Sequence, residues 1–341
     1  MGRISSGILT SVRIIAGALA LAFVVATANP VSAQQPNSVN PTASAVQEQD
    51  LLKALNGKIQ GRGSIPDTKS YVLEHPAGRD WREFRTVTLK WIGGIAILGM
   101  IAVLAIYYLW RGPMRVKAGY SGIKILRFDV FDRFVHWLTA STFIVLAITG
   151  LNITFGRSLL LPLMGLEAFS TWSEWGKVAH NYLSFAFTIG VLLMFVMWVG
   201  RNMPTAADVT WVKMAGGMFD KTDSTHAPAY KFNAGQMMLY WLVVLASAGM
   251  IVTGFILMFP FYYGLNVGNM ELAQILHGVV GMLFLSLMVA HIYLGTLGME
   301  GAFEAMSQGT VDLNWAKEHH NLWVEEEMQA GHIKGAMRPA E

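Results

Sequence analysis

Four histidines within long apolar segments are the residues of this chain best suited to chemistry: His136, His180, His277 and His291. An ionisable side chain inside a bilayer is costly, so it marks a functional site by default. A neutral imidazole binds haem iron, zinc or copper. Each histidine alone is equally consistent with an interfacial or hydrogen-bonded packing residue, so the arrangement of the whole set carries the prediction.

The composition limits which metal sites and which classes of protein are possible. The 341 residues include no cysteine, which excludes disulfides, cysteine-bound iron–sulfur clusters, zinc fingers and covalently attached haem. Hydrophobic residues make up 53% and charged residues 14%, against about 25% charged residues in soluble domains. These values argue against a soluble enzyme and against disorder. The net charge of +3 is too small for a nucleic-acid-binding protein.

Five apolar stretches each approach the ~20 residues that a helix needs to cross a bilayer core. Aromatic residues flank each stretch, as in the aromatic belts of membrane proteins. The stretches cover residues 89–110, 136–155, 180–199, 237–259 and 277–297. We therefore predict an all-α membrane protein, a transmembrane helix bundle with a four-helix core over 111–297 and one additional N-terminal span at 89–110.

Basic residues are distributed unevenly over the predicted loops, and their distribution indicates the orientation. Loop 111–135 has six lysines and arginines and loop 200–236 has four, whereas loop 156–179 has two and loop 260–276 has none. Because basic loops stay in the cytoplasm, the first two loops and the tail at 298–341 are predicted to be cytoplasmic. The first span alone is ambiguous, because basic residues also crowd its outer end.

The N-terminal residues 1–33 are typical of a secretory signal peptide. Arg3 and Arg13 flank an apolar run at 14–28, and Val31-Ser32-Ala33 is a small-residue cleavage site. An uncleaved membrane helix is the alternative. Either interpretation places the segment 34–88 outside the cytoplasm.

This orientation sorts the four histidines into two pairs by depth. His136 begins an outward-running span near the cytoplasmic face, whereas His180 and His277 begin inward-running spans near the outer face. His291 follows His277 by 14 residues, which places it about 21 Å deeper and on the same face of the helix. The prediction is an outer pair, His180 with His277, and an inner pair, His136 with His291.

Two stacked histidine pairs are what two b haems require, because low-spin haem iron takes one imidazole on each side of the ring. Gly281 and Gly295 each follow a histidine by four residues and could leave room for a ring; ordinary close helix packing is the alternative for these glycines. A zinc or copper transporter would gather its histidines at one depth and add carboxylates, which the spans lack. The pairing by depth therefore favours two haems over a transported metal.

Two further patterns carry less weight. The second span ends in Thr149-Gly150 and the fourth in Thr253-Gly254, and each is followed by a span that opens with histidine. This weak repeat is consistent with an old helix-pair duplication, but Thr-Gly is common in membrane helices. The remaining histidines lie in loops or in the tail, where surface positions are expected, and no cofactor is assigned to them: His75, His226, His319, His320 and His332.

Several motifs resemble the cytochrome b556 (gamma) subunit of respiratory membrane-bound formate dehydrogenase. Asp132-Arg133-Phe134-Val135-His136-Trp137 resembles the D-R-x-x-H-W opening of its first haem helix. The other matches are Gly176-Lys177-Val178-Ala179-His180 in its second haem helix, the His277 and His291 spacing in its last helix, Lys231-Phe232-Asn233-Ala234-Gly235-Gln236 and Asn314-Trp315-Ala316-Lys317-Glu318-His319-His320. The similarity covers residues 125–327, and residues 1–110 depart from the shortest members of the family.

This resemblance implies a dihaem electron-transfer subunit in the bacterial inner membrane, with a periplasmic N-terminal segment. Its partners would be an iron–sulfur beta subunit and a molybdenum or tungsten alpha subunit that oxidises formate. Electrons would enter at the outer haem and leave from the inner haem to menaquinone or ubiquinone. Asn233, Gly235 and His291 would line the quinone site on the cytoplasmic side. Asn233 is equally suited to cap the fourth helix, since asparagine before an apolar helix is a favoured N-cap.

Two other functions remain open from the sequence. A cytochrome b subunit of nickel–iron hydrogenase or thiosulfate reductase shares D-R-x-x-H-W, but the N-A-G-Q segment and the W-A-K-x-H-H tail favour formate dehydrogenase. A haem-free membrane anchor or transporter belongs to a different class, which a reduced b-type spectrum would distinguish.

Overall fold

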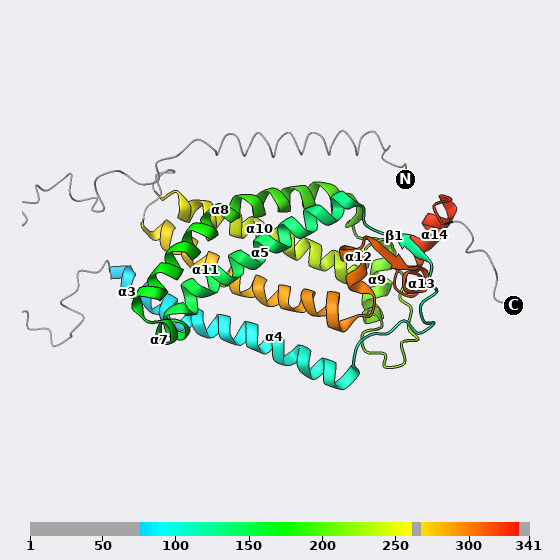
Figure 1. Cartoon of the computed structure of the whole chain (residues 1–341), viewed down its shortest axis with the longest axis horizontal. Helices are drawn as coiled ribbons and strands as arrows, with labels where there is room; N and C mark the ends of the chain where they lie inside the picture. The colour runs from blue at the N-terminus through cyan, green and yellow to red at the C-terminus, as the bar shows by residue number, and fades with distance from the viewer. Residues whose placement is uncertain (1–75, 261–266, 334–341) are drawn as a thin grey trace, which may run out of the picture.

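The computed structural model describes residues 76–260 and 267–333. The predicted signal peptide and most of the predicted outer segment lie outside the described residues. Five long helices run side by side along the molecule (Figure 1). They are α4 (Leu89–Arg111), α5 (Val130–Leu151), α8 (Leu166–Trp198), α10 (Ala234–Met258) and α11 (Val267–Tyr293). All five are long and apolar enough to cross a membrane, so the prediction of a helical membrane bundle is confirmed.

Shorter elements complete the described chain. Before α4 come α3 (Pro76–Glu83) and a π-helical turn at Phe84–Thr88. Between α5 and α8 in sequence come a π-helical turn at Asn152–Gly156, α6 (Arg157–Leu159) and α7 (Leu161–Met164). Between α8 and α10 come a 3₁₀ turn at Val199–Arg201, α9 (Ala206–Lys213) and a second 3₁₀ turn at Ala215–Gly217. The C-terminal elements are a π-helical turn at Leu294–Gly298, α12 (Ala302–Ser307), β2 (Thr310–Asp312), α13 (Leu313–His319) and α14 (Asn321–Gln329). Strand β2 pairs in antiparallel fashion with β1 (Lys124–Leu126).

The helices extend further than the apolar stretches that predict them. α8 begins at Leu166, well before His180, and α11 begins at Val267, before His277. Polar side chains such as Glu174 belong to these extensions. Hydropathy predicts only the apolar part of a helix that can lie within the bilayer, whereas capping residues determine where the helix begins and ends. The start of α5 is such a cap, where Asp129 and Asp132 form a capping box.

The core pairs α5 with α8, and α11 with both α10 and α4. α4, which was predicted as an additional span, packs along α11: the Ser286 hydroxyl donates to the carbonyl of Ala96 at 2.8 Å, and Gly93 lies against Met282. At the end of α4, the buried guanidinium of Arg111 donates to the carbonyl of Met218 at 2.9 Å and pairs with Asp223 at 2.6 Å. α4 is therefore joined to the bundle at both its middle and its end.

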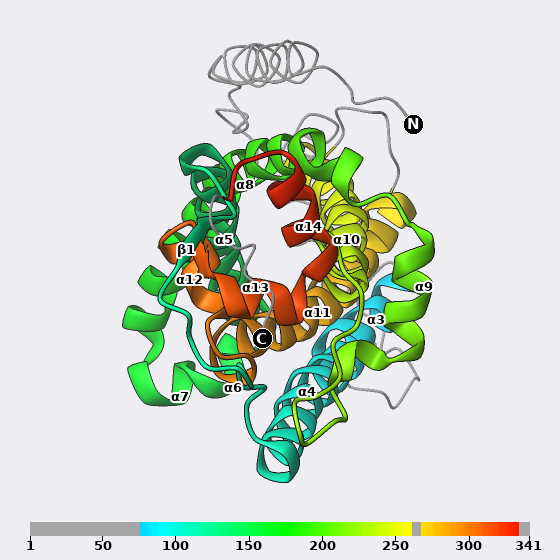
Figure 2. The same ribbon diagram turned by 90° about the vertical axis from the view of Figure 1, so that its right-hand side faces the viewer.

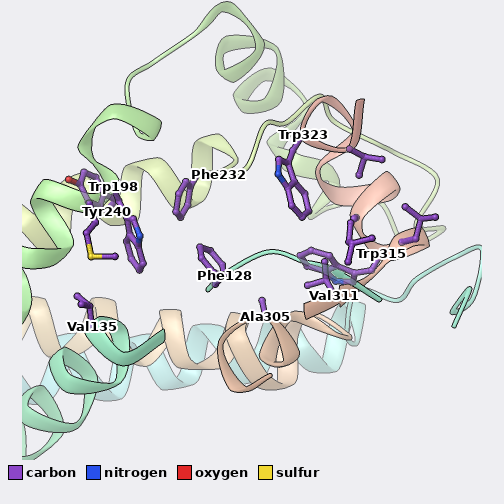
Figure 3. Close-up of a cluster of buried hydrophobic side chains, with 14 of the residues drawn as sticks. Phe128, Val135, Trp198, Phe232, Tyr240, Ala305, Val311, Trp315 and Trp323 are labelled. Carbon is purple, nitrogen blue, oxygen red and sulfur yellow. The ribbon is translucent and has the colours of Figure 1, made fainter. Parts of the chain in front are cut away.

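A small module closes one end of the bundle, which we call the tail end (Figures 1 and 2). It is built from β1, β2, α9 and α12–α14, and its aromatic side chains gather in one cluster with Trp198 and Tyr240 of the spanning helices (Figure 3). Arg127 is only 2% exposed and lies 5.0 Å from the Trp315 ring centre and 5.4 Å from that of Trp323. Its guanidinium also donates to the carbonyl of Lys231 at 2.7 Å, which holds the segment that leads into α10.

The prediction of surface positions for the tail histidines is wrong for His320. Its side chain is 1% exposed, and its Nδ1 lies 2.7 Å from the carbonyl oxygen of Tyr230. Burial holds the pKa of His320 well below its usual range, so this imidazole is neutral. The tail packs inward because Trp315 and Trp323, which are distant from the spans in sequence, complete the aromatic cluster. In contrast, the side chain of His332 is 70% exposed.

Gly190→Ala should destabilise the contact between α5 and α8. A Cβ atom at Gly190 would lie 2.4 Å from Thr139 Oγ1 and 3.3 Å from its Cα, so the helices would have to separate. We expect a loss of about 1–3 kcal/mol, as for an overpacked core, measured as a lower midpoint of thermal unfolding in detergent. Gly249→Ala on α10 is the control, because a Cβ there meets no atom within 4 Å. Equal midpoints for the two variants would contradict this view of the packing.

Candidate functional site

The structure brings the four histidines of the spanning helices together as two pairs. His180 of α8 faces His277 of α11, with ring centres 6.3 Å apart and ring planes at 64°. His136 of α5 faces His291 of α11 with the same 6.3 Å separation and planes at 63°. Helix α11 therefore supplies one member of each pair, and the two pairs lie about 21 Å apart along it, given the rise of an α-helix.

The separation within each pair fits two ligands on one iron. An imidazole nitrogen binds a transition metal at about 2 Å and the ring centre lies about 1 Å beyond it, so two opposed imidazoles have ring centres about 6 Å apart. Both observed separations match this value. Within the described ranges, 76–260 and 267–333, no group of three or more histidines and carboxylates gathers at one point. The donor set thus fits bis-imidazole haem better than a zinc or copper site.

Two threonines contact His180 and His277, the pair predicted to be the outer one, and the predicted site did not include these threonines. Thr149 Oγ1 lies 2.7 Å from Nδ1 of His180, and Thr253 Oγ1 lies 2.9 Å from Nδ1 of His277. These threonines are the ones in the Thr-Gly repeat noted in the sequence. The two copies of the Thr-Gly repeat therefore make equivalent contacts: Thr149 contacts His180, and Thr253 contacts His277.

The glycines of the same repeat let the imidazole rings approach the helices. A Cβ atom at Gly254 would lie 3.3 Å from Cε1 of His277, and one at Gly150 would lie 3.8 Å from Cε1 of His180. Gly281 and Gly295, which were predicted to leave room for a haem ring, have other surroundings: a Cβ at Gly281 would lie 3.3 Å from Met250, and one at Gly295 would meet no atom within 4 Å. The close approach of the two imidazoles is therefore permitted by glycines of α5 and α10, the helices that face His180 and His277.

The inner pair has different surroundings. The buried Nδ1 of His136 has no hydrogen-bond partner among the described residues. The Trp137 ring lies edge-on to His136 with ring centres 5.1 Å apart, and its Nε1 donates to the carbonyl of Met306 in α12. On the same helix, Asp132 accepts from Trp198 Nε1 at 2.9 Å. The D-R-x-x-H-W motif thus fixes the start of α5 against the tail-end module while it presents His136.

Asn233 and Gly235 lie at the start of α10, at the tail end. Asn233 is the N-cap: its side-chain oxygen accepts from the Gln236 N–H at 2.9 Å, and the Gln236 side chain accepts from the Asn233 N–H at 3.2 Å. The interpretation as a helix cap is therefore confirmed. In the part of the chain that the structure describes, no hydrogen bond engages the Asn233 amide nitrogen, and none joins Asn233 or Gly235 to His291.

Two features around this segment were not predicted from the sequence, namely the residue that covers Gly235 and the surroundings of Lys231. Trp211 of α9 covers Gly235, where a Cβ atom would lie 2.8 Å from Cη2 of the indole. Lys231 lies within 5.0 Å of the Phe128 ring centre, and burial, with a smaller contribution from Arg201, lowers the pKa of Lys231 to about 8. Neither contact has a local sequence signal, because each joins residues that are far apart in the sequence.

Together, the membrane bundle and its two half-buried histidine pairs define a b-type cytochrome of the multi-pass membrane class. The sequence model of the family described as prokaryotic cytochrome b561 matches residues 127–309, which is more than half of the chain. The chain belongs to this family, which implies haem b as its cofactor.

Curated relatives agree with this assignment. The nitrate-inducible formate dehydrogenase cytochrome b556(Fdn) subunit of Escherichia coli K12 is 27% identical over 205 residues, which cover 59% of this chain and 91% of the relative. The formate dehydrogenase cytochrome b556(fdo) subunit of the same strain is 25% identical, with 59% and 92% covered. The formate dehydrogenase cytochrome b556 subunit of Haemophilus influenzae is 24% identical, with 60% and 84% covered.

Proposed function

We propose that this chain is the dihaem cytochrome b subunit of a formate dehydrogenase complex and that it transfers electrons across the membrane to quinone. The observation that carries the proposal is the pair of equal 6.3 Å separations in His180–His277 and His136–His291. The names of the relatives support formate dehydrogenase over nickel–iron hydrogenase or thiosulfate reductase.

The proposal requires partner subunits. With no cysteine in the chain, the iron–sulfur clusters that relay electrons must belong to another subunit, and formate must be oxidised on a molybdenum or tungsten subunit. The chain itself would be the electron-transferring and quinone-reducing part of the complex. Electrons would enter from the periplasmic side near His180 and His277.

The residues of this chain would hold and insulate the cofactors. Haem iron, when bound, supplies reversible one-electron chemistry. The histidines of α11 and of its partners α5 and α8 would supply the four axial nitrogens, and the packed helices would exclude water from them. The rigid α11 would keep the two sites at a constant separation.

The tail end is proposed to be cytoplasmic and to contain the quinone site. Asn233 and Gly235 lie at this end, and the Asn233 amide nitrogen and the Gly235 N–H could both donate to a quinone carbonyl. Lys231, beside them, could exchange protons with cytoplasmic water while the quinol forms. Inward electron flow and proton uptake on the inner side would together charge the membrane.

Replacing one histidine of a pair should remove one haem. His180→Ala or His277→Ala should lose the outer haem, and His136→Ala or His291→Ala the inner one, because each haem would lose one of the two imidazoles that hold it. The measurement is haem b per chain by the pyridine haemochromogen spectrum of the purified complex, with two expected for the parent and one for each variant. His332→Ala is the control, because its side chain is exposed. Full haem content in all four variants would refute the pairing, and a parent without haem would indicate a haem-free anchor.

Two substitutions at Asn233 separate quinone binding from helix capping. Asn233→Leu removes both functions and should cost about 0.5–2 kcal/mol as a lost N-cap. Asn233→Asp keeps a good N-cap but removes the amide donor. We expect formate to reduce the haems in both variants and quinone to reoxidise them slowly, measured by stopped-flow spectroscopy of the assembled complex. Parental reoxidation rates in the aspartate variant would remove Asn233 from the quinone site.

The proposed orientation can be tested because the chain contains no cysteine. Ser170→Cys places a thiol at the exposed outer end of α8, and Ser224→Cys places one in the exposed loop before α10. A membrane-impermeant maleimide should label Ser170→Cys in intact spheroplasts and Ser224→Cys only after permeabilisation. The cysteine-free parent is the control for background labelling. The opposite labelling pattern would invert the topology.

A further inference from the structure

We propose that Thr149 and Thr253 are positioning residues that lower the reduction potential of the outer haem, so that electrons run downhill from the outer to the inner site. The inference rests on the proposed two-haem function. It concerns the direction of electron flow within the chain, which the placement of four axial ligands does not determine by itself.

The other hydrogen bonds of each threonine determine whether the threonine or the histidine is the donor in the contact between them. Thr149 Oγ1 lies 2.8 Å from the carbonyl oxygen of Val145, and Thr253 Oγ1 lies 2.7 Å from that of Gly249. A hydroxyl has one proton, which it donates to the carbonyl, so its oxygen accepts from the imidazole. Nδ1 of His180 is therefore the protonated nitrogen of that ring, and Thr253 fixes His277 in the same way.

This tautomer is the one that haem iron requires here. With Nδ1 protonated, the lone pair of Nε2 is free for the metal, whereas the other tautomer would present an N–H to the iron. The contacts at 2.7 Å and 2.9 Å also restrict rotation of the two rings. Gly150 and Gly254, directly after the threonines, allow the rings to come this close.

The hydrogen bond that each imidazole donates to a threonine oxygen also changes the imidazole as a ligand. An imidazole that donates its Nδ1–H to an oxygen becomes more basic at the nitrogen that binds the metal. A more basic ligand stabilises ferric iron more than ferrous iron, so the reduction potential falls. At the outer site both ligands carry this hydrogen bond, whereas the buried Nδ1 of His136 at the inner site has no partner among the described residues. The outer site should therefore have the lower potential.

The transfer step is balanced without an added reactant. One electron would pass from the haem held by His180 and His277 to the haem held by His136 and His291, so that one is oxidised as the other is reduced. Thr149 and Thr253 would hold the Nδ1 proton of the two outer ligands, so the step needs no proton transfer. The partner subunit then supplies the next electron to the outer site.

The test replaces each threonine by valine, which has the same shape but no hydroxyl. We expect Thr149→Val and Thr253→Val each to raise the midpoint potential of the outer haem in the purified complex, by about 59 mV for each tenfold loss of preference for the ferric form. The potential of the inner haem should stay constant. The outer haem is identified in the redox titration as the component that His180→Ala lacks.

Matched controls separate this role from a structural one. Thr142→Val lies on the same helix as Thr149 and removes a similar hydroxyl, which donates to the carbonyl of Leu138 at 2.7 Å and contacts no histidine. It should leave both potentials unchanged. Thr149→Ser and Thr253→Ser retain the hydroxyl and should restore the parental potential. Loss of the outer haem in a valine variant, with retention in its serine counterpart and in Thr142→Val, supports the same positioning role.

Other outcomes overturn the inference. Unchanged potentials in both valine variants, an equal shift in Thr142→Val, or failure of serine to restore the parental value would each show that the hydroxyls do not tune the site. An outer haem with a higher potential than the inner one in the parent complex would also contradict it. A parent complex without two haems would instead refute the proposed function.

Discussion

One helix, α11, must face two partners at once, and the rest of the structure depends on this constraint. His277 has to meet His180 on α8, and His291 has to meet His136 on α5, at nearly the same separation. α5 and α8 therefore pack closely, which Gly190 permits. On another side of α11, α4 adds the contact between Ser286 and Ala96, so the helix is supported by neighbours along its length.

The tail-end module links the inner pair to the segment proposed to bind quinone. Arg127 lies between aromatic rings and donates to the carbonyl of Lys231 just before α10, while Trp137, next to His136, donates to Met306. Since α5 and α10 are both tied to the same module, the relative positions of His136 and Asn233 depend on residues of the C-terminal tail. A polar tail in sequence is thus part of the architecture that surrounds the inner site.

The sequence predicted the spanning helices from their hydropathy, and it predicted the histidine pairs from the depth of each histidine within its span. Hydropathy located the membrane portions, but the beginnings of α8 and α11 were missed because their outer turns are polar. Thr149 and Thr253 were visible in the sequence, yet only the fold shows that each hydroxyl reaches an imidazole. The burial of His320 and the position of Trp211 depend on contacts between distant loops, which leave no periodic signal.

Because His277 and His291 lie on one uninterrupted helix, the number of residues between them sets both the distance and the relative rotation of the two sites. Inserting or deleting a single residue between them would turn one histidine by about 100° relative to the other and shift it by about 1.5 Å along the axis. Substitutions between the two histidines preserve this register, whereas a change in length destroys one pair or the other. The length of the segment is therefore restricted more strictly than its composition, and homologues with two intact sites should show this restriction.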